Sequence, residues 1–333
     1  MTDLIDVENL TLHFGTDEGL ITVVDEMSFS LEAGEVMGLV GESGSGKSVS
    51  ARSLMKLNAK NAVYGADTKI TLHLDDGPVD VMALETARDM KIVRGGAISM
   101  IFQEPMASFA PAITIGSQMV EQLQIHTDMT RKKAREVSIA MLDRVGISDP
   151  AKRFTQYAFE LSGGMRQRAM IAMALSTRPK LLIADEPTTA LDVTIQAQVL
   201  DLMKDLVAEF GMGIIFITHD LGVIAQIADT VAVMYLGRLV EQGPVREVIR
   251  NPVHPYTKGL LAALPQLDDL DAELVPVAGD IPSPLERPAG CVFHTRCGVA
   301  IDGVCQRVVP LFTQLSDDHR VSCHRASEQQ VVV

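Results

Sequence analysis

The chain has 333 residues, of which 47% are hydrophobic, and its formal net charge is −14 at pH 7. This length and apolar content predict one large α/β domain with an appendage, while the acidic balance argues against binding nucleic acid through charge. No apolar run approaches the ~18 residues of a membrane span and no basic, apolar leader opens the chain, so we expect a cytosolic protein that reaches a membrane only through a partner.

A glycine-rich loop follows the first predicted strands. Residues 4–14 and 21–31 alternate between apolar and polar side chains, which predicts two strands. The short apolar run 36–40 predicts a third strand that leads directly into GESGSGKS at 41–48. A strand, this loop and a helix in that order indicate a phosphate-binding loop, in which backbone amides and the positive end of the helix hold the β- and γ-phosphates of a nucleotide.

The residue types in this loop each have a physical role. Gly41, Gly44 and Gly46 allow the backbone to adopt positive φ and to turn its amides inward. Lys47 brings a positive charge to the β/γ-phosphate oxygens, and Ser48 supplies a hydroxyl to Mg²⁺. The residues predicted to contact the nucleotide here are Gly41, Ser43, Gly44, Ser45, Gly46, Lys47, Ser48 and Val49.

The middle of the chain predicts a hairpin, a strand and a helical segment. Residues 69–83 alternate on both sides of the turn sequence DDGP, as in a β-hairpin. The apolar run 97–102 predicts a strand that ends at Gln103, and 115–146 is polar with a helical pattern. The basic residues of that segment are expected to form a solvated face rather than a binding site: Arg131, Lys132, Lys133 and Arg135.

A second element of phosphate chemistry comes at the end of another predicted strand. The apolar run 181–184 delivers Asp185 and Glu186, the arrangement known as Walker B. We expect Asp185 to help hold Mg²⁺ through water, and Glu186 to polarise the attacking water as a general base. An acidic pair at a strand end is common by itself, but beside a phosphate-binding loop it predicts nucleotide hydrolysis.

The segment just before this strand carries the motif that points to a family. Residues 161–167, LSGGMRQ, resemble the signature motif of the ABC ATPases in a variant of its shortest form, LSGGQ. Ser162 and the amides of Gly163 and Gly164 lie at a predicted helix start, where they would form a second anion site. The resemblance implies that this site, with Gln167, faces the γ-phosphate bound to the other subunit of a dimer.

Four further positions match elements of that family. Gln103 matches the Q-loop glutamine, which contacts Mg²⁺ and water and whose loop reports to the membrane partner. His219, which follows the apolar run 214–218, matches the switch histidine that contacts the γ-phosphate. Asp192 matches the D-loop, which crosses to the partner subunit. Phe14 matches the A-loop aromatic that stacks on adenine, although the family more often has tyrosine there and an ordinary core strand residue is the alternative.

The C-terminal part of the chain has a different composition. Prolines interrupt the pattern after about residue 250, which makes long helices unfavourable. Residues 251–265, NPVHPYTKGLLAALP, resemble the C-terminal extension of the oligopeptide and dipeptide importer ATPases. This resemblance places the chain in that branch of the family.

The four cysteines of the chain are also C-terminal, at Cys291, Cys297, Cys305 and Cys323. In a reducing cytosol such a group favours metal or cluster ligation over disulfides, and four thiolates can hold a [4Fe–4S] cluster or Zn²⁺. Their spacing does not separate these two, but the family comparison favours an iron–sulfur cluster, with zinc or unligated thiols as the alternatives. We expect the role of the cluster to be structural rather than redox sensing. His294 and His324 lie beside cysteines and are reserve ligands.

The resemblance implies an α/β fold, namely a P-loop ABC ATPase with a RecA-like core, an antiparallel β subdomain and a helical signature subdomain at about 104–165. The predicted domains are 1–250 for nucleotide binding and 251–333 for the importer extension, a small irregular region that holds the cysteines. Catalysis is assigned to Lys47, Glu186 and His219. Mg²⁺ is assigned to Ser48, Gln103 and Asp185.

The implied function is that of an ATP-hydrolysing subunit that energises import of peptides or related small solutes, bound peripherally to the cytoplasmic face of the inner membrane. Its implied partners are a second, different ATPase chain, two transmembrane permease subunits and an extracytoplasmic solute-binding protein, and we expect no nucleic acid. Importers of nickel, sugars or opines in the same branch are an alternative. A soluble ABC ATPase acting on DNA or the ribosome is disfavoured because the chain has no long heptad insertion and no second cassette. The intact Glu186 argues against a regulatory module without turnover.

Overall fold

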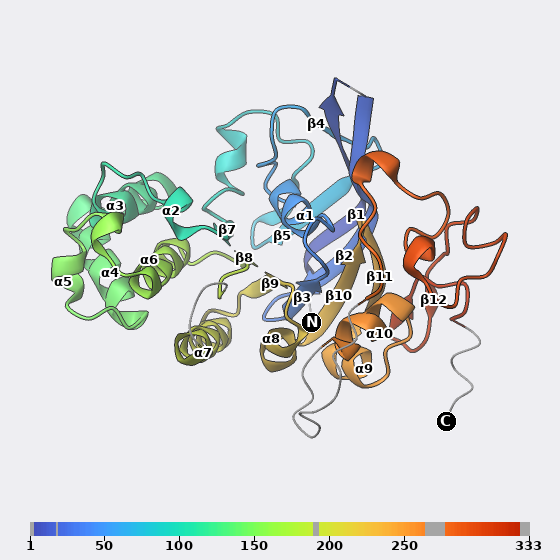
Figure 1. Cartoon of the computed structure of the whole chain (residues 1–333). Helices are drawn as coiled ribbons and strands as arrows, with labels where there is room; N and C mark the ends of the chain where they lie inside the picture. Colours follow the sequence, from blue (N-terminus) through green and yellow to red (C-terminus); the bar gives the residue numbers. More distant parts are fainter. Residues whose placement is uncertain (1–2, 18, 189–192, 264–276, 327–333) are drawn as a thin grey trace. The chain divides into compact units, whose positions relative to one another are not determined.

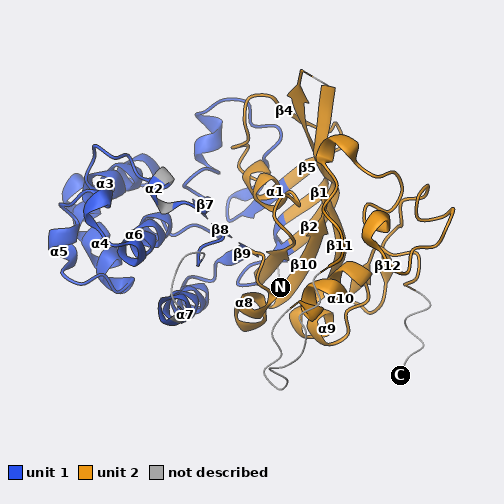
Figure 2. Ribbon diagram, in the orientation of Figure 1, with its two compact units in different colours: residues 1–5, 31–35, 71–217 blue, residues 6–30, 36–70, 218–333 orange. Residues whose placement is uncertain are grey.

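The computed structural model describes residues 3–17, 19–188, 193–263 and 277–326, and it divides into two compact units (Figure 2). Unit 1 contains residues 1–5, 31–35 and 71–217, and unit 2 contains residues 6–30, 36–70 and 218–333. Each unit is therefore assembled from three separate stretches of sequence. The predicted domain boundary at residue 250 stays a prediction, and the residues beyond it belong to unit 2.

The central strands of unit 2 run in parallel and are buried. β3 (Val36–Val40) pairs with β10 (Thr230–Tyr235), with Met37 opposite Thr230. Every residue of β3 is buried, as in a strand covered on both faces. From β10 the strand order continues with the antiparallel strands β11 (Arg238–Pro244), β13 (Arg320–Val321) and β12 (Thr313–Gln314). The strand predicted at 36–40 is thus confirmed.

Two long strands account for most of the N-terminal part of unit 2. They are β1 (Asp3–Thr16) and β2 (Gly19–Glu32), which confirm the strands predicted at 4–14 and 21–31. The short strand β4 (Ala62–Tyr64) pairs antiparallel with β1 and places Ala62 opposite Phe14. Along β1 the apolar side chains of Ile5, Leu10 and Leu12 are fully buried, and they form part of the core.

The helices of unit 2 are all short. Among the described residues, α1 is the only helix of this unit before residue 218 (Figure 1). Prolines interrupt the segments after β11, as predicted. The helical segments are α1 (Lys47–Ser53), α8 (Leu221–Ile227), α9 (Val245–Arg250), α10 (Pro255–Ala262), η3 (Pro284–Glu286) and η4 (His294–Arg296).

Unit 1 contains three parallel strands in the order β9-β8-β7. β7 (Ile98–Ile101), β8 (Leu181–Asp185) and β9 (Gly213–Thr218) are buried along their whole length. The helix α7 (Val193–Phe210) connects β8 to β9. The predicted hairpin is also present as β5 (Lys69–Leu74) and β6 (Gly77–Asp80), followed by the single turn η1 (Asp89–Lys91).

The rest of unit 1 is helical, drawn in green in Figure 1. The segment predicted at 115–146 forms two helices, and Thr130 caps the second by accepting a hydrogen bond from the amide of Lys133 at 3.3 Å. Each helix buries an apolar stripe, such as Ile115, Met119 and Leu123 in the first. The helical segments are α2 (Pro105–Ser108), α3 (Ile115–His126), α4 (Arg131–Arg144), α5 (Pro150–Arg153), η2 (Ala158–Glu160) and α6 (Gly163–Ser176). None of the helices in the described part of the chain has the length and apolar content needed to cross a bilayer.

Candidate functional site

The glycine-rich loop joins β3 to α1 in unit 2. Gly44 and Gly46 have φ angles of 80° and 103°, in the left-handed region that favours glycine. A Cβ atom on Gly46 would lie 2.8 Å from the carbonyl oxygen of Val23, so a larger residue would have to displace backbone. The positive φ angles predicted for Gly44 and Gly46 are therefore present, and they bend the chain tightly between strand and helix.

Lys47, the first residue of α1, turns its ammonium group back into the loop. Its Nζ donates hydrogen bonds to the carbonyl oxygens of Gly41 at 2.7 Å and Glu42 at 2.9 Å, and the residue is 6% exposed. The carbonyl of the buried Ser45 accepts a hydrogen bond from the amide of Gly237 at 2.8 Å, which ties the loop to the turn between β10 and β11. The loop thus has a defined shape with a cation inside it.

In unit 1, the side chains that follow two parallel strands meet. The amide nitrogen Nε2 of Gln103, after β7, donates a hydrogen bond to Oε2 of Glu186, after β8, at 2.9 Å. Glu186 has a φ of 47° and its amide donates to the carbonyl of Ile217 at 2.9 Å, which fixes its backbone. Asp185, the last residue of β8, is fully buried. The two carboxylates and the amide thus lie at the carboxyl ends of neighbouring strands, where α/β proteins bind ligands.

The signature segment begins helix α6. Ser162 is the N-cap and its side chain accepts a hydrogen bond from the amide of Met165 at 3.4 Å. Ser162 and Gly163 are exposed, and a Cβ on Gly163 would meet nothing within 4 Å, so the helix start is open. Gln167 is instead buried, and its side-chain amide donates to the carbonyl of Pro187. This bond connects α6 to the segment that follows Glu186.

Three further predicted residues are His219, Phe14 and Asp192. His219 is exposed and sits between β9 and the N-cap of α8, where the Asp220 carboxylate accepts from the amide of Gly222 at 2.7 Å. Phe14 is half-buried on β1, so both interpretations of it stay open. Asp192, the predicted D-loop residue, lies outside the described residues.

Comparison with known proteins decides the family. The chain matches the family model "ABC transporter" over residues 24–189 and "Oligopeptide/dipeptide transporter, C-terminal region" over 240–305. It is 47% identical to the oligopeptide transport ATP-binding protein OppD of Salmonella typhimurium, over 92% of this chain and 90% of that protein. The chain belongs to the ABC transporter family of ATP-binding proteins. This ABC ATPase is also 46% identical to the dipeptide transport ATP-binding protein DppD of Bacillus subtilis, over 97% of this chain and 95% of that protein.

Solved structures agree with the predicted ABC ATPase fold. The post-hydrolysis dimer of the ATP-binding cassette MJ0796, bound to ADP and Pi, matches with a TM-score of 0.64 at 23% identity, over 73% of this chain and 99% of that chain. The cbiO1 protein of Clostridium perfringens, part of the transporter complex cbiONQ, matches with a TM-score of 0.61 at 26% identity, over 75% and 92%. The fold expected from the motifs is therefore confirmed.

The four cysteines of this ABC ATPase come together in unit 2. They line one small cavity of about 20 Å³, whose wall also includes His254, His294 and His324. The cysteines are free thiols, and the amide of Cys291 donates to the carbonyl of Cys305 at 2.9 Å. Nevertheless, within the described residues no three or more His, Cys, Asp or Glu side chains are arranged to hold one metal ion. The structure thus gathers the predicted ligands without giving them ligand geometry.

Burial favours the protonated form of three of these thiols, those of Cys291, Cys297 and Cys323. It raises the pKa of Cys291 to about 11, and it also raises the pKa values of Cys297 and Cys323. The thiolate is the form that binds metal, so loading this cavity would release protons. His294 and His324 make hydrogen bonds with the carbonyl oxygens of Cys291 and Val308 at 2.8 and 2.9 Å.

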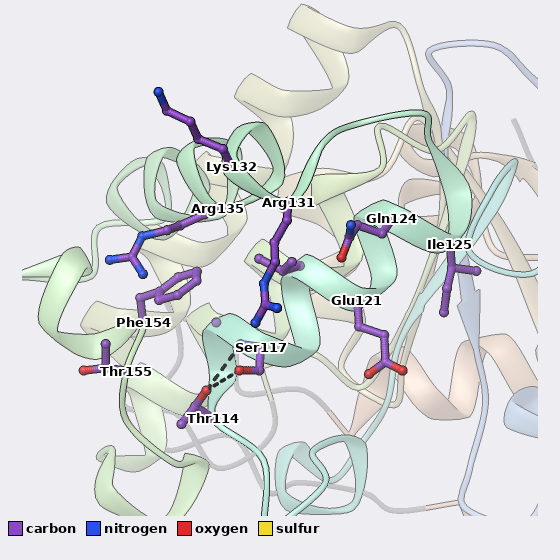
Figure 3. Close-up of a pocket in the computed structure, with 12 residues that line it drawn as sticks. Thr114, Ser117, Glu121, Gln124, Ile125, Arg131, Lys132, Arg135, Phe154 and Thr155 are labelled. Atoms are coloured by element: carbon purple, nitrogen blue, oxygen red, sulfur yellow. Dashed lines mark hydrogen bonds between the residues drawn. The ribbon is translucent and has the colours of Figure 1, made fainter.

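A separate cavity of about 810 Å³ lies in the helical part of unit 1 (Figure 3). Arg131, Lys132 and Arg135 of α4 line it together with residues of α3, so this part of the predicted solvated face borders a hollow. The guanidinium of Arg135 lies 4.8 Å from the centre of the Phe154 ring, within cation–π range. None of the residues predicted to bind nucleotide lines this cavity.

The sequence predictions missed the contacts of one loop residue with two residues of the C-terminal region. Glu42, the second residue of the loop, is bonded by Arg296 and Tyr256 of the C-terminal region. Tyr256 lies inside the motif 251–265 and Arg296 directly precedes Cys297. An acidic residue within a phosphate-binding loop was the one local signal that a cation should lie nearby.

Proposed function

We propose that this ABC ATPase hydrolyses ATP to energise the import of peptides or related small solutes across the cytoplasmic membrane. The observation that carries the proposal is the identity of 46–47% to peptide-transport ATP-binding proteins along nearly the whole chain. The match to the C-terminal region of oligopeptide and dipeptide transporters supports the same branch. Nickel, sugars or opines as cargo would be detected by the same experiments.

The proposed chemistry assigns one role to each predicted residue. Lys47, already directed into the phosphate loop, would exchange its bonds to loop carbonyls for phosphate oxygens. Glu186 would orient and polarise the attacking water, with Gln103 as its hydrogen-bonding neighbour. His219 would contact the γ-phosphate.

Mg²⁺ is the metal implied by this chemistry. Ser48, Gln103 and Asp185 would hold it, and their hydroxyl, amide and carboxylate oxygens are the donor types that Mg²⁺ prefers. When bound, the ion would neutralise charge on the β- and γ-phosphates. Asp185, fixed by the fully buried strand β8, has the carboxylate on which this assignment depends most.

The signature segment supports a proposal about assembly. The open start of α6 at Ser162, Gly163 and Gly164 suits an anion from outside the chain, so we propose that it completes the ATP site of a second ATPase subunit. Asp192 would cross the same interface.

The further partners would be two permeases and a solute-binding protein, with this chain on the cytoplasmic face. We also retain the division into a nucleotide-binding domain, 1–250, and an importer extension, 251–333.

The four cysteines are proposed as ligands of a [4Fe–4S] cluster. The support is chemical, since four thiols line one cavity. The cluster would act as a structural staple for a segment whose strands, β12 and β13, have only two residues each. Anaerobic purification should give about four iron atoms per chain and a brown colour. One zinc atom per chain would favour the zinc site instead. A folded chain that contains neither iron nor zinc would contradict both metal assignments.

The decisive test of the proposed function is turnover in the assembled transporter. Glu186→Gln should lower ATP hydrolysis at least 100-fold, because the general base is lost, while ATP still binds. Glu85→Gln, an exposed residue of the same unit, is the matched control and should leave turnover unchanged. Unchanged turnover in Glu186→Gln would refute the base assignment. Stimulation of turnover by the solute-binding protein loaded with di- or oligopeptides, rather than nickel or sugars, would identify the cargo class.

A further inference from the structure

Glu42, the second residue of the phosphate loop, forms hydrogen bonds with two residues of the C-terminal region. Both Nη atoms of Arg296 donate to the Glu42 carboxylate, at 2.7 Å to Oε2 and 3.1 Å to Oε1. The backbone amide of Glu42 donates to the hydroxyl oxygen of Tyr256 at 2.8 Å. Side chain and backbone of one loop residue are therefore each held from a segment more than 200 positions away.

The side chain of Arg296 is buried and held in place by several hydrogen bonds. Its side chain is 4% exposed, and its remaining donors bond the carbonyl oxygens of Ala278 at 2.9 Å and Val277 at 3.1 Å. Burial alone would lower the pKa of Arg296, but the hydrogen bonds and charge of Glu42 and Tyr235 outweigh it and raise the pKa. The guanidinium therefore stays charged, and its planar fork matches the carboxylate in two parallel bonds.

Tyr256 is fixed by an aromatic cluster. Its ring packs against Tyr235 and Phe293, with centroid distances of 4.8 and 5.4 Å, and the residue is fully buried. The hydroxyl can reach the loop only because α10 and the turn around Phe293 hold the ring in place. The ion pair of Glu42 with Arg296 and the hydrogen bond of Glu42 with Tyr256 thus connect the phosphate loop to the folded C-terminal region.

A carboxylate in a phosphate-binding loop weakens nucleotide binding, because its negative charge repels the phosphates that the loop must bind. The carbonyl of the same residue, Glu42, also accepts from Lys47 Nζ at 2.9 Å, so a shift of Glu42 would move the phosphate-binding lysine. We infer that Arg296 and Tyr256 are positioning residues, of which Arg296 neutralises the Glu42 carboxylate and Tyr256 holds the Glu42 backbone, so that the C-terminal region sets the affinity of the loop for ATP. This inference rests on the proposed nucleotide-binding role of the loop.

The test is titration of the full-length chain with mant-ATP and Mg²⁺. Arg296→Ala should weaken binding about tenfold, because a charge-assisted bidentate pair is lost and the Glu42 charge is uncovered. Arg296→Lys keeps the charge without the fork and should give a smaller loss. Tyr256→Phe keeps the ring and loses only the hydroxyl, with an expected loss of about threefold.

A double variant separates neutralisation from general destabilisation. The double variant Arg296→Ala, Glu42→Gln lacks the charge that repels the nucleotide, so it should regain most of the affinity that Arg296→Ala loses. A purely structural role of Arg296 would not give this coupling between the two substitutions. In the assembled transporter, Arg296→Ala should raise KM for ATP and leave kcat within about twofold, because positioning acts before the chemical step.

Arg287→Ala is the matched control. Arg287 is another mostly buried arginine of the C-terminal region, but its Nη2 pairs with Asp25 of β2 at 2.8 Å, so the variant should bind mant-ATP like the wild type. If Lys47→Ala abolishes binding while Arg296→Ala and Arg296→Lys bind like the wild type, the inference is overturned and the proposed function stands. If the wild type fails to bind mant-ATP, the proposed function falls and the inference with it.

Discussion

Gly44 and Gly46 share a left-handed backbone but differ in their surroundings. A Cβ on Gly44 would meet nothing within 4 Å, whereas one on Gly46 would lie 2.8 Å from the Val23 carbonyl oxygen. Gly44→Ala should therefore cost only the strain of the left-handed conformation, about 1–2 kcal/mol. Gly46→Ala should cost clearly more in the free energy of unfolding, because backbone must also move.

Urea unfolding of the two alanine variants checks this difference. The two substitutions add the same methyl group, so each serves as the control for the other. Equal losses of unfolding free energy would show that the contact with Val23 relaxes without cost, and that the phosphate loop is softer than its hydrogen bond to Gly237 suggests.

Single residues with local roles were the easiest part of the site to predict. Lys47 and Glu186 follow directly from a strand and a motif, and the structure places the first inside its loop and the second beside Gln103. The pairing of Glu42 with Arg296 could not be predicted, because the two residues are 254 positions apart and no periodicity relates them. The roles of these motif residues in catalysis stay predictions.

Helix α10 depends on a buried charge network. The fully buried Glu241 on β11 accepts hydrogen bonds from the backbone amides of Val253 and His254 at 2.8 and 2.9 Å, and it contacts His319 at 3.0 Å. His254 then caps α10, because its Nδ1 accepts from the amide of Tyr256 at 3.1 Å. Protonating either Glu241 or that nitrogen would remove an acceptor that the helix start requires.

Acidification should therefore weaken the fold. Burial lowers the pKa of His254 to about 4. Between pH 6.5 and 4, His254 is therefore protonated in the unfolded chain but neutral in the folded chain. The free energy of unfolding consequently falls as the pH falls through this range. Burial acts to raise the pKa of Glu241, but its hydrogen bonds outweigh burial and lower it. Glu241 therefore stabilises the fold fully at pH values above its pKa in the unfolded chain. This stabilisation is also lost as the pH falls through the pKa of Glu241 in the folded chain.

We expect the free energy of unfolding to drop by about 2 kcal/mol between pH 7 and 4.5 through His254 alone. Urea unfolding across that range measures it. The control is His254→Asn, whose side-chain oxygen can still cap α10 but does not titrate, so its pH slope should be smaller. An identical slope in both proteins would contradict the role given to His254.

Elements were predictable where their pattern is continuous in sequence. β3, β8 and β9 are apolar runs buried along their whole length, and the helical segment 115–146 proved to be α3 and α4. The two-residue strands β12 and β13 could not be predicted, because a pair so short has no alternation and is defined only by its neighbour β11. The C-terminal cysteines were predicted to meet, and they line one cavity.

For the whole molecule, the open start of α6 leads to a prediction about assembly. In the Glu186→Gln background, with its partner ATPase and Mg·ATP, the chain should accumulate as a pair of subunits, because bound ATP is not consumed. Ser162→Arg should prevent this by filling the exposed helix start, and light scattering reports the mass. Thr130→Arg, at the exposed N-cap of α4, should leave the pair intact. Pairing unaffected by Ser162→Arg would contradict the shared site.

The interleaving of the two units has a consequence for how the chain is made. β3 leaves the ribosome early, but its parallel neighbour β10 comes about 190 positions later. At roughly 5–20 residues per second in synthesis, this buried apolar strand, with the phosphate loop behind it, must wait about 10–40 s for that neighbour. The pairing that places β3 and the phosphate loop is therefore completed only after residue 235 has been made.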